Sequence, residues 1–107
     1  ILQDHVFVAI IGGRIMGCIV LKEGDGAFMW LDVLAVEPGQ RNTGVGKALI
    51  LFGEDYIRSR GASECRLYTH VKYERTAAIY RHLGYEIYNR VQEYGFDRFY
   101  MKKRLSD

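Results

Sequence analysis

The sequence predicts a single α/β domain in the order β-β-β-α-β-α-β-β, with two helices placed among six strands. Three observations predict it. Gly12-Gly13 joins two runs rich in Val and Ile, which indicates a β-hairpin. From Gly44 the spacing of apolar residues changes from 2 to about 3.6, which is the period of a helix. The 107 residues can bury one hydrophobic core and are too few for two.

The first three elements are predicted to be strands. Residues 5–11 and 14–22 flank the two-glycine turn, so they are expected to pair antiparallel. After the polar turn at 23–26, residues 28–36 are apolar at nearly every position, with Asp32 as the one charge. Such a run is typical of a strand that is covered on both faces.

The fourth element is predicted to be an amphipathic helix. Pro38 and Gly39 end the strand that precedes it. Its apolar positions follow spacings of four, three and four residues: Val45, Leu49, Phe52 and Tyr56. Glu54 and Arg58 lie four residues apart, which predicts an ion pair on the polar side of the helix. Gly61 predicts the end of the helix.

The second half of the chain predicts a strand, a short helix and two further strands. Residues 64–71 form the strand, and residues 75–83 form the helix, which ends at Gly84. The last two runs, 85–94 and 96–105, are rich in aromatic residues and read as strands.

Composition excludes several classes of partner. Fifteen basic and 13 acidic residues give a net charge of +2, so no polybasic surface for nucleic acid or anionic lipid is indicated. The longest apolar run, residues 6–11, is far shorter than the ~20 residues that span a bilayer. The three His residues, Cys18 and Cys65 lack metal-ligand spacing, so no metal is expected. Two thiols outside any disulfide framework favour the cytoplasm.

A glycine-containing turn, residues 40–47, connects the third predicted strand to the first predicted helix. Backbone N–H groups at a helix N-terminus attract anions, and glycines allow phosphate oxygens to approach them. Arg41 and Lys47 add positive side chains. The turn therefore predicts an anion site, although Gly44 and Gly46 taken alone are equally compatible with a simple change of chain direction.

Two common phosphate motifs do not fit this turn. A dinucleotide fingerprint needs a third glycine at position 49, which is Leu49. A Walker loop that starts at Gly39 needs Lys and Ser or Thr where Val45 and Gly46 stand.

Residues 34–49 resemble the acetyl-CoA signature of the GNAT superfamily of N-acetyltransferases, whose central element is Arg/Gln-x-x-Gly-x-Gly/Ala. Arg41, Gly44 and Gly46 fill that element. Residues 79–85, Ile-Tyr-Arg-His-Leu-Gly-Tyr, are similar to the second signature of the superfamily, in which a helix ends in aliphatic-Tyr-x-x-Leu-Gly-aromatic. Two signatures at the expected separation identify the chain as similar to this superfamily.

The resemblance implies a mixed, mostly antiparallel central sheet with helices on both faces. Its strands at 28–36 and 64–71 are expected to splay apart and admit the pantetheine arm of the cosubstrate. The resemblance covers nearly all of the chain but not the first strand of the family fold or the helix pair after it. Residues 1–107 are therefore expected to be one domain that is incomplete at its N-terminus.

The resemblance also implies acetyl-CoA as cosubstrate and a set of residues that bind it. The backbone groups of Leu34 and Val36, with Ala35 between them, would pair with the pantetheine amides. Thr76 stands where the family often has an asparagine that contacts the cofactor. The pyrophosphate would be held by one continuous segment: Arg41, Asn42, Thr43, Gly44, Val45, Gly46 and Lys47.

Three residues are candidates for the chemistry of acetyl transfer, which needs a neutral amine and an acid for the departing thiolate. Tyr80, in the second signature, is the candidate acid, and its alternative role is simple packing. Asp32 is a candidate base, or a residue that recognises the amine, and its alternative is an ion pair. By alternation it shares a face with Trp30, Leu34 and Val36, unless a bulge near Leu34 changes where it points. His70 is a second candidate base, and its alternative is a hydrogen-bonded histidine at a strand end. An ordered water is the remaining option.

The leading hypothesis is a cytoplasmic N-acetyltransferase that moves acetyl from acetyl-CoA to a primary amine of a small molecule or protein. The attack would be direct, within a ternary complex. The alternative is a catalytically silent CoA-binding module with a regulatory or interaction role, and an acyltransferase for longer acyl groups is a third reading. A homodimer is one assembly that the sequence allows.

Overall fold

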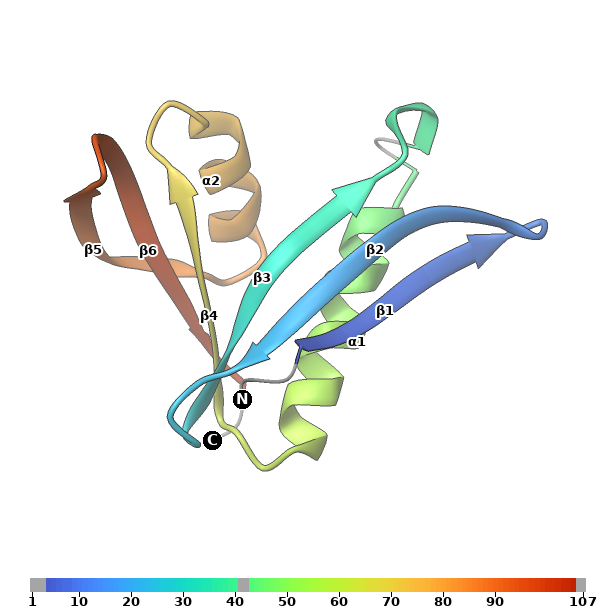
Figure 1. Ribbon diagram of the computed structural model, residues 1–107, viewed down its shortest axis with the longest axis horizontal. Helices are drawn as coiled ribbons and strands as arrows, with labels where there is room; N and C mark the ends of the chain where they lie inside the picture. Colours follow the sequence, from blue (N-terminus) through green and yellow to red (C-terminus); the bar gives the residue numbers. More distant parts are fainter. Residues whose placement is uncertain (1–3, 41–42, 106–107) are drawn as a thin grey trace.

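The structure is a computed structural model that describes residues 4–40 and 43–105 (Figure 1). Its elements follow the predicted order, and the bounds of each predicted strand agree within one residue. The elements are β1 (Asp4–Ile11), β2 (Arg14–Glu23), β3 (Phe28–Val36), η1 (Pro38–Gln40), α1 (Val45–Ser59), β4 (Glu64–His70), α2 (Glu74–His82), β5 (Glu86–Glu93) and β6 (Phe96–Arg104).

The strands form a mixed, mostly antiparallel sheet, as expected, in the order β1-β2-β3-β4-β6-β5. Only β3 and β4 run parallel, and their register holds for three pairs: Phe28 with Glu64, Met29 with Cys65, and Trp30 with Arg66. Beyond Trp30 the two strands diverge in a V, which Figure 1 shows between the tips of β3 and β4. The sheet is therefore split at its centre. On either side of the split, β3 stays paired with β2 and β4 stays paired with β6.

Both described helices pack on one face of this sheet. Cys65 of β4 lies on that face, close to Glu54 of α1, whose charge acts on the pKa of the Cys65 thiol. Tyr80 of α2 is close to the same thiol. The helices on the second face, which the resemblance implies, are not among the described elements, and that face carries aromatic side chains such as Trp30.

The buried face of α1 is rotated from the predicted one. Val45, Leu49 and Ile57 are buried, whereas Phe52 is 47% exposed. The reason is Gly53, which lies over the sheet so closely that an added Cβ would be 2.9 Å from Cδ1 of Ile19. Phe52 instead packs edge-on against Phe7 of β1, at the margin of the sheet.

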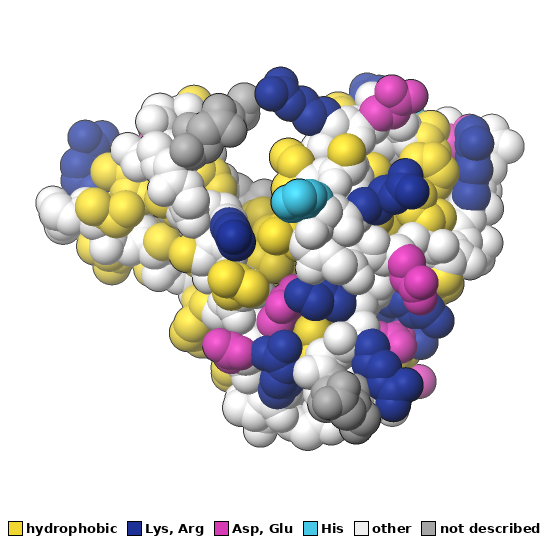
Figure 2. Space-filling view, turned by 180° about the vertical axis from the view of Figure 1, so that it is seen from behind, with side chains coloured by type: hydrophobic (Ala, Val, Ile, Leu, Met, Phe, Trp, Pro, Cys, Tyr) yellow, Lys and Arg dark blue, Asp and Glu magenta, His cyan; other side chains and the backbone are white. Residues whose placement is uncertain are grey.

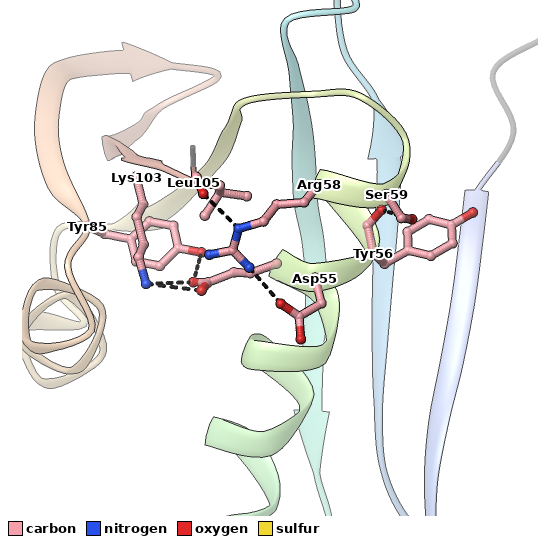
Figure 3. Close-up of polar contacts among 8 residues, drawn as sticks. Asp55, Tyr56, Arg58, Ser59, Tyr85, Lys103 and Leu105 are labelled. Carbon is pink, nitrogen blue, oxygen red and sulfur yellow. Dashed lines mark hydrogen bonds and ion pairs between the residues drawn. The ribbon is translucent and has the colours of Figure 1, made fainter. Parts of the chain in front are cut away.

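The predicted ion pair between Glu54 and Arg58 is wrong. Because Gly53 centres the helix over the sheet, Glu54 points into the core and is 2% exposed. Arg58 bonds Asp55 at 2.6 Å and donates to the backbone carbonyl of Leu105 at 2.7 Å, as Figure 3 shows. The charge of Glu54 is met instead by Lys103, a residue 49 positions away in sequence.

The two cysteines are free and differ in accessibility, which predicts different reactivity. Burial raises the pKa of Cys65 to about 12, and its side chain is fully buried, whereas Cys18 is partly exposed. Because the thiolate is the reactive form, an alkylating reagent at pH 8 is expected to label Cys18 and spare Cys65. Peptide mass spectrometry checks this, and labelling of both thiols in the folded protein at equal rates would contradict the placement of Cys65.

Candidate functional site

A cavity of about 1000 Å³ occupies the region where β3 and β4 diverge. One wall comes from the end of β3 and the start of α1, and the other comes from α2 and the residues beside it. Figure 2 shows the hollow on the rear face, with hydrophobic side chains at its floor. The lining residues are Leu34, Val36, Gln40, Gly44, Gly46, Lys47, Ile50, Tyr73, Arg75, Thr76, Ala78, Ile79, His82 and Leu83.

Six of the residues predicted to bind the cofactor line this cavity: Leu34, Val36, Gly44, Gly46, Lys47 and Thr76. Ala35 and Thr43 are exposed and Val45 is buried, and none of these three lines the cavity. The Thr43 hydroxyl donates to the carbonyl of Gln40 at 2.5 Å. Arg41 and Asn42 lie outside the described residues.

The sequence analysis missed two charged or polar residues on the opposite wall, Arg75 and His82. They lie seven positions apart on α2, which places them on one side of the helix two turns apart. That spacing was the available signal. It carried no weight because Arg75 lies outside the second signature and His82 occupies one of its variable positions.

The start of α1 presents backbone to the cavity with no side chain in between. Gly44 precedes the helix with φ 91°, in the left-handed region, and makes no side-chain cap. The first bond of the helix runs from the N–H of Ala48 to the carbonyl of Gly44 at 2.9 Å, so the N–H groups at 45–47 precede it. At Gly46 an added Cβ would lie 3.4 Å from Cγ2 of Val36, another lining residue. With Lys47 alongside, these groups suit an anion such as a phosphate.

A β-bulge changes where Asp32 points. Val20 pairs with Val33 and Leu21 with Leu31, so Asp32 has no partner across β2. The extra residue breaks the alternation of β3. The prediction that Asp32 shares a face with Leu34 and Val36 is therefore wrong, because Leu34 turns toward the core and the cavity on the helix side.

The carboxylate of Asp32 lies on the opposite face of the sheet. Its Oδ2 is 3.5 Å from Nζ of Lys22, whose position in β2 is opposite Trp30. The side chain of Asp32 is 25% exposed. The ion pair that was the alternative role for this residue is thus present, and the carboxylate still reaches solvent.

Tyr80 is buried and does not itself line the cavity, although its neighbour Ile79 does. The residue is 8% exposed, and its ring packs edge-on against Tyr85, with centroids 5.5 Å apart. Its hydroxyl has no hydrogen-bond partner among the described residues. Every fully buried side-chain oxygen of those residues has a partner, so the Tyr80 hydroxyl is not fully buried. The hydroxyl therefore retains contact with solvent. Burial raises the pKa of Tyr80 to about 12, so the phenol is a proton donor at neutral pH.

His70, at the end of β4, is held by its own turn. Its Nδ1 accepts the backbone N–H of Lys72 at 3.1 Å, so the neutral ring carries its proton on Nε2. The ring also contacts those of Tyr73 and Phe96. In this arrangement the Nδ1 lone pair of His70 is engaged by the backbone of its own turn.

The profile of the acetyltransferase (GNAT) family matches residues 2–85. The chain belongs to the GNAT acetyltransferase family. A second comparison agrees: N-alpha-acetyltransferase 30 of Schizosaccharomyces pombe is 30% identical over 103 residues, which cover 90% of this chain and 69% of that protein.

Two further relatives extend the comparison. Mycothiol acetyltransferase of Beutenbergia cavernae is 34% identical over 73 residues, or 68% of this GNAT chain. The chain spans only 25% of that protein. The solved structure of a GNAT family acetyltransferase from Elizabethkingia anophelis with acetyl-CoA bound matches with a TM-score of 0.86 at 17% identity, covering 94% of this chain and 76% of that one. That likeness establishes the GNAT fold.

Among residues 4–40 and 43–105, no group of three or more His, Cys, Asp or Glu side chains lies close enough to hold a metal ion. Neither helix in the same ranges has the length and apolar character needed to cross a membrane.

Proposed function

We propose that this chain binds acetyl-CoA in the cavity and transfers its acetyl group to a primary amine. The observation that carries the proposal is the uncapped, glycine-flanked start of α1, which faces a cavity opened by the divergence of β3 and β4. Family membership supports the same reaction class. A related fold with acetyl-CoA bound supports the same ligand.

The cavity wall made by β3 and the start of α1 would hold first the pantetheine arm and then the pyrophosphate of the cosubstrate. Beyond Trp30 the edge of β3 no longer pairs with β4, so backbone groups near Leu34 and Val36 can bond the pantetheine amides as an added strand would. The pyrophosphate would lie on the N–H groups at 45–47, with Lys47 and Thr43 beside it, and the family motif adds Arg41 and Asn42 as predicted ligands. Ala35 contributes backbone only.

The opposite wall would complete the cosubstrate site. Thr76 has a hydroxyl that can bond the pantetheine arm, and it lines the cavity together with the apolar side chains of Ile79 and Leu83. Arg75 and His82 add donors on the same wall, where a further phosphate of CoA can be met.

The reaction balances with groups that this chain supplies. The amine nitrogen attacks the thioester carbonyl carbon, a C–N bond forms, and the C–S bond breaks with its electron pair passing to sulfur. Tyr80 donates its phenolic proton to the thiolate and is reprotonated from solvent. A backbone N–H near Leu34 polarises the carbonyl.

The proton released by the amine passes to Asp32, directly or through a water. Asp32 is favoured over His70 because the Nδ1 lone pair of His70 already accepts the backbone N–H of Lys72, whereas the Asp32 carboxylate reaches solvent. Its position also separates the substrates: the cosubstrate would enter from the helix side of the V and the amine from the other face. The free state of both cysteines supports the cytoplasm as the compartment. The homodimer stays a prediction.

Release of CoA thiol by the full-length protein tests this function. The panel is small primary amines, peptides with free α-amino groups and peptides with a single lysine. We expect thiol release from acetyl-CoA to depend on at least one of these acceptors. Tight binding of acetyl-CoA with no acceptor-dependent release would favour the catalytically silent CoA-binding module instead.

A further inference from the structure

Next to Tyr80 lies a buried polar cluster of Glu54, Tyr85 and Lys103, which the proposed chemistry does not use. Glu54 of α1 is 2% exposed and accepts a hydrogen bond from the hydroxyl of Tyr85 at 2.9 Å. Nζ of Lys103 in β6 lies 3.0 and 3.2 Å from the two carboxylate oxygens of Glu54. Figure 3 shows Tyr85 and Lys103 reaching the same carboxylate, from the segment after α2 and from β6.

The cluster fixes the ring that supports Tyr80. Tyr85 is 2% exposed, and its ring meets the Tyr80 ring edge-on, with an angle of 74° between the planes. The backbone N–H of Tyr85 also donates to the carbonyl of Tyr80 at 3.0 Å. Tyr80 has no hydrogen bond from its own hydroxyl within the described residues, so its orientation depends on such packing contacts.

Filling the core does not require this hydroxyl. Phenylalanine would occupy the same volume at position 85, and a buried carboxylate and hydroxyl are unfavourable unless each finds a partner. Among the described residues, the ion-pair partner of Glu54 is Lys103, and this pair does not need Tyr85. The bond from Tyr85 to Glu54 therefore adds something beyond charge pairing, namely a fixed position for the Tyr85 ring between α1 and α2.

We infer that Glu54 and Tyr85 are positioning residues, which hold the Tyr80 ring so that its hydroxyl stays aimed at the reacting sulfur. The inference rests on the proposed role of Tyr80 as the acid. Neither residue lines the cavity, so their effect is expected on the rate of the chemical step and not on the affinity for acetyl-CoA.

A double-mutant cycle on the full-length protein tests the inference. The variants are Tyr85→Phe, Tyr80→Phe and the two combined, with kcat read from CoA thiol release to the best amine of the panel, or to water where no amine serves. We expect Tyr85→Phe to lower kcat roughly five-fold, with KM for acetyl-CoA changed less than two-fold. In the Tyr80→Phe background the same change is expected to alter kcat less than two-fold, because the hydroxyl that it positions is gone.

The outcomes separate this inference from the assignment of Tyr80. An equal loss of kcat from Tyr85→Phe in both backgrounds, or no loss in either, overturns the positioning role while the acid role of Tyr80 stands. If Tyr80→Phe itself leaves kcat unchanged, both the acid role and the positioning role are overturned. Tyr56→Phe is the matched control, because it removes a tyrosine hydroxyl that bonds His5 of β1 at 2.8 Å, on the side of α1 that packs against β1.

A second variant guards against loss of the folded state. Tyr85→Leu removes the ring as well as the hydroxyl, and we expect kcat to fall at least as far as in Tyr85→Phe, again only when Tyr80 is present. All rates are measured below the thermal midpoint of each variant, so whichever variant is recovered folded carries the test. A loss of kcat by Tyr85→Leu that is independent of Tyr80 overturns the inference in the same way.

Discussion

Gly46→Glu is expected to weaken acetyl-CoA binding about 100-fold or more, which corresponds to about 2.7 kcal/mol. The new side chain would start in the cavity, where an added Cβ meets only Cγ2 of Val36, at 3.4 Å. Its carboxylate would then occupy the N–H groups at the start of α1 and repel the phosphates that the site is proposed to hold. Calorimetric titration of acetyl-CoA into the folded variant measures the change.

Gly39→Glu is the control for this prediction. Gly39 precedes the same loop, does not line the cavity, and has no heavy atom within 4 Å of an added Cβ. Its affinity for acetyl-CoA is expected to stay within two-fold of the wild type. Gly44→Glu is the less informative variant, because φ 91° at Gly44 would add backbone strain to any effect on binding. Wild-type affinity in folded Gly46→Glu would remove the start of α1 from the cofactor site.

Tyr80→Phe is expected to lower kcat about 100-fold while acetyl-CoA affinity changes less than two-fold. The ring and its contact with Tyr85 remain, and only the proton donor is lost. Stopped-flow or coupled thiol assays under conditions where chemistry is rate-limiting give kcat, and calorimetry gives the affinity. Tyr56→Phe, which loses a hydroxyl bonded to His5, is expected to keep kcat within two-fold.

The pH dependence of kcat should carry the signature of a buried phenol. The acid must be protonated, so its contribution is present below its pKa and is lost as the pH rises through that value. Because burial raises the pKa of Tyr80 to about 12, kcat should show no descending limb from this group below about pH 11. A descending limb near pH 10 that disappears in Tyr80→Phe would show an ordinary, solvated phenol instead.

The strands, the hairpin and the glycine turn could be predicted because local signals specify them. Gly12 and Gly13 both adopt positive φ, and Gly61 ends α1 in the same conformation, as their positions in the sequence indicated. The wall formed by Leu34, Val36 and the glycines at 44 and 46 was predicted through the resemblance of one strand and one turn to the GNAT signature. These features depend on residues that are close together in sequence.

Two features could not be predicted because they depend on residues far apart in sequence. The bulge at Asp32 is a mismatch in the pairing of β2 with β3; a bulge near Leu34 was one alternative, but the pattern of β3 alone does not specify whether one occurs. The burial of Glu54 depends on Gly53 meeting Ile19 and on Lys103, which lies at the far end of the chain. In the sequence, a glutamate four residues before Arg58 was indistinguishable from a surface residue.

The second wall of the cavity was also only partly predictable. Thr76 was reached through its place in the family motif, whereas Arg75 and His82 became visible only once α2 was seen to face β3 across the V. A cavity lined by two helices that are far apart in sequence has no local sequence signal.

A crystal structure of the full-length protein with acetyl-CoA tests the central claim most directly. The account predicts the pantetheine arm between β3 and β4 beside Leu34 and Val36, the pyrophosphate on the N–H groups at 45–47, and the thioester sulfur within hydrogen-bond distance of the Tyr80 hydroxyl. Acetyl-CoA bound elsewhere on the protein, with the cavity between β3 and α2 left to solvent, would contradict it.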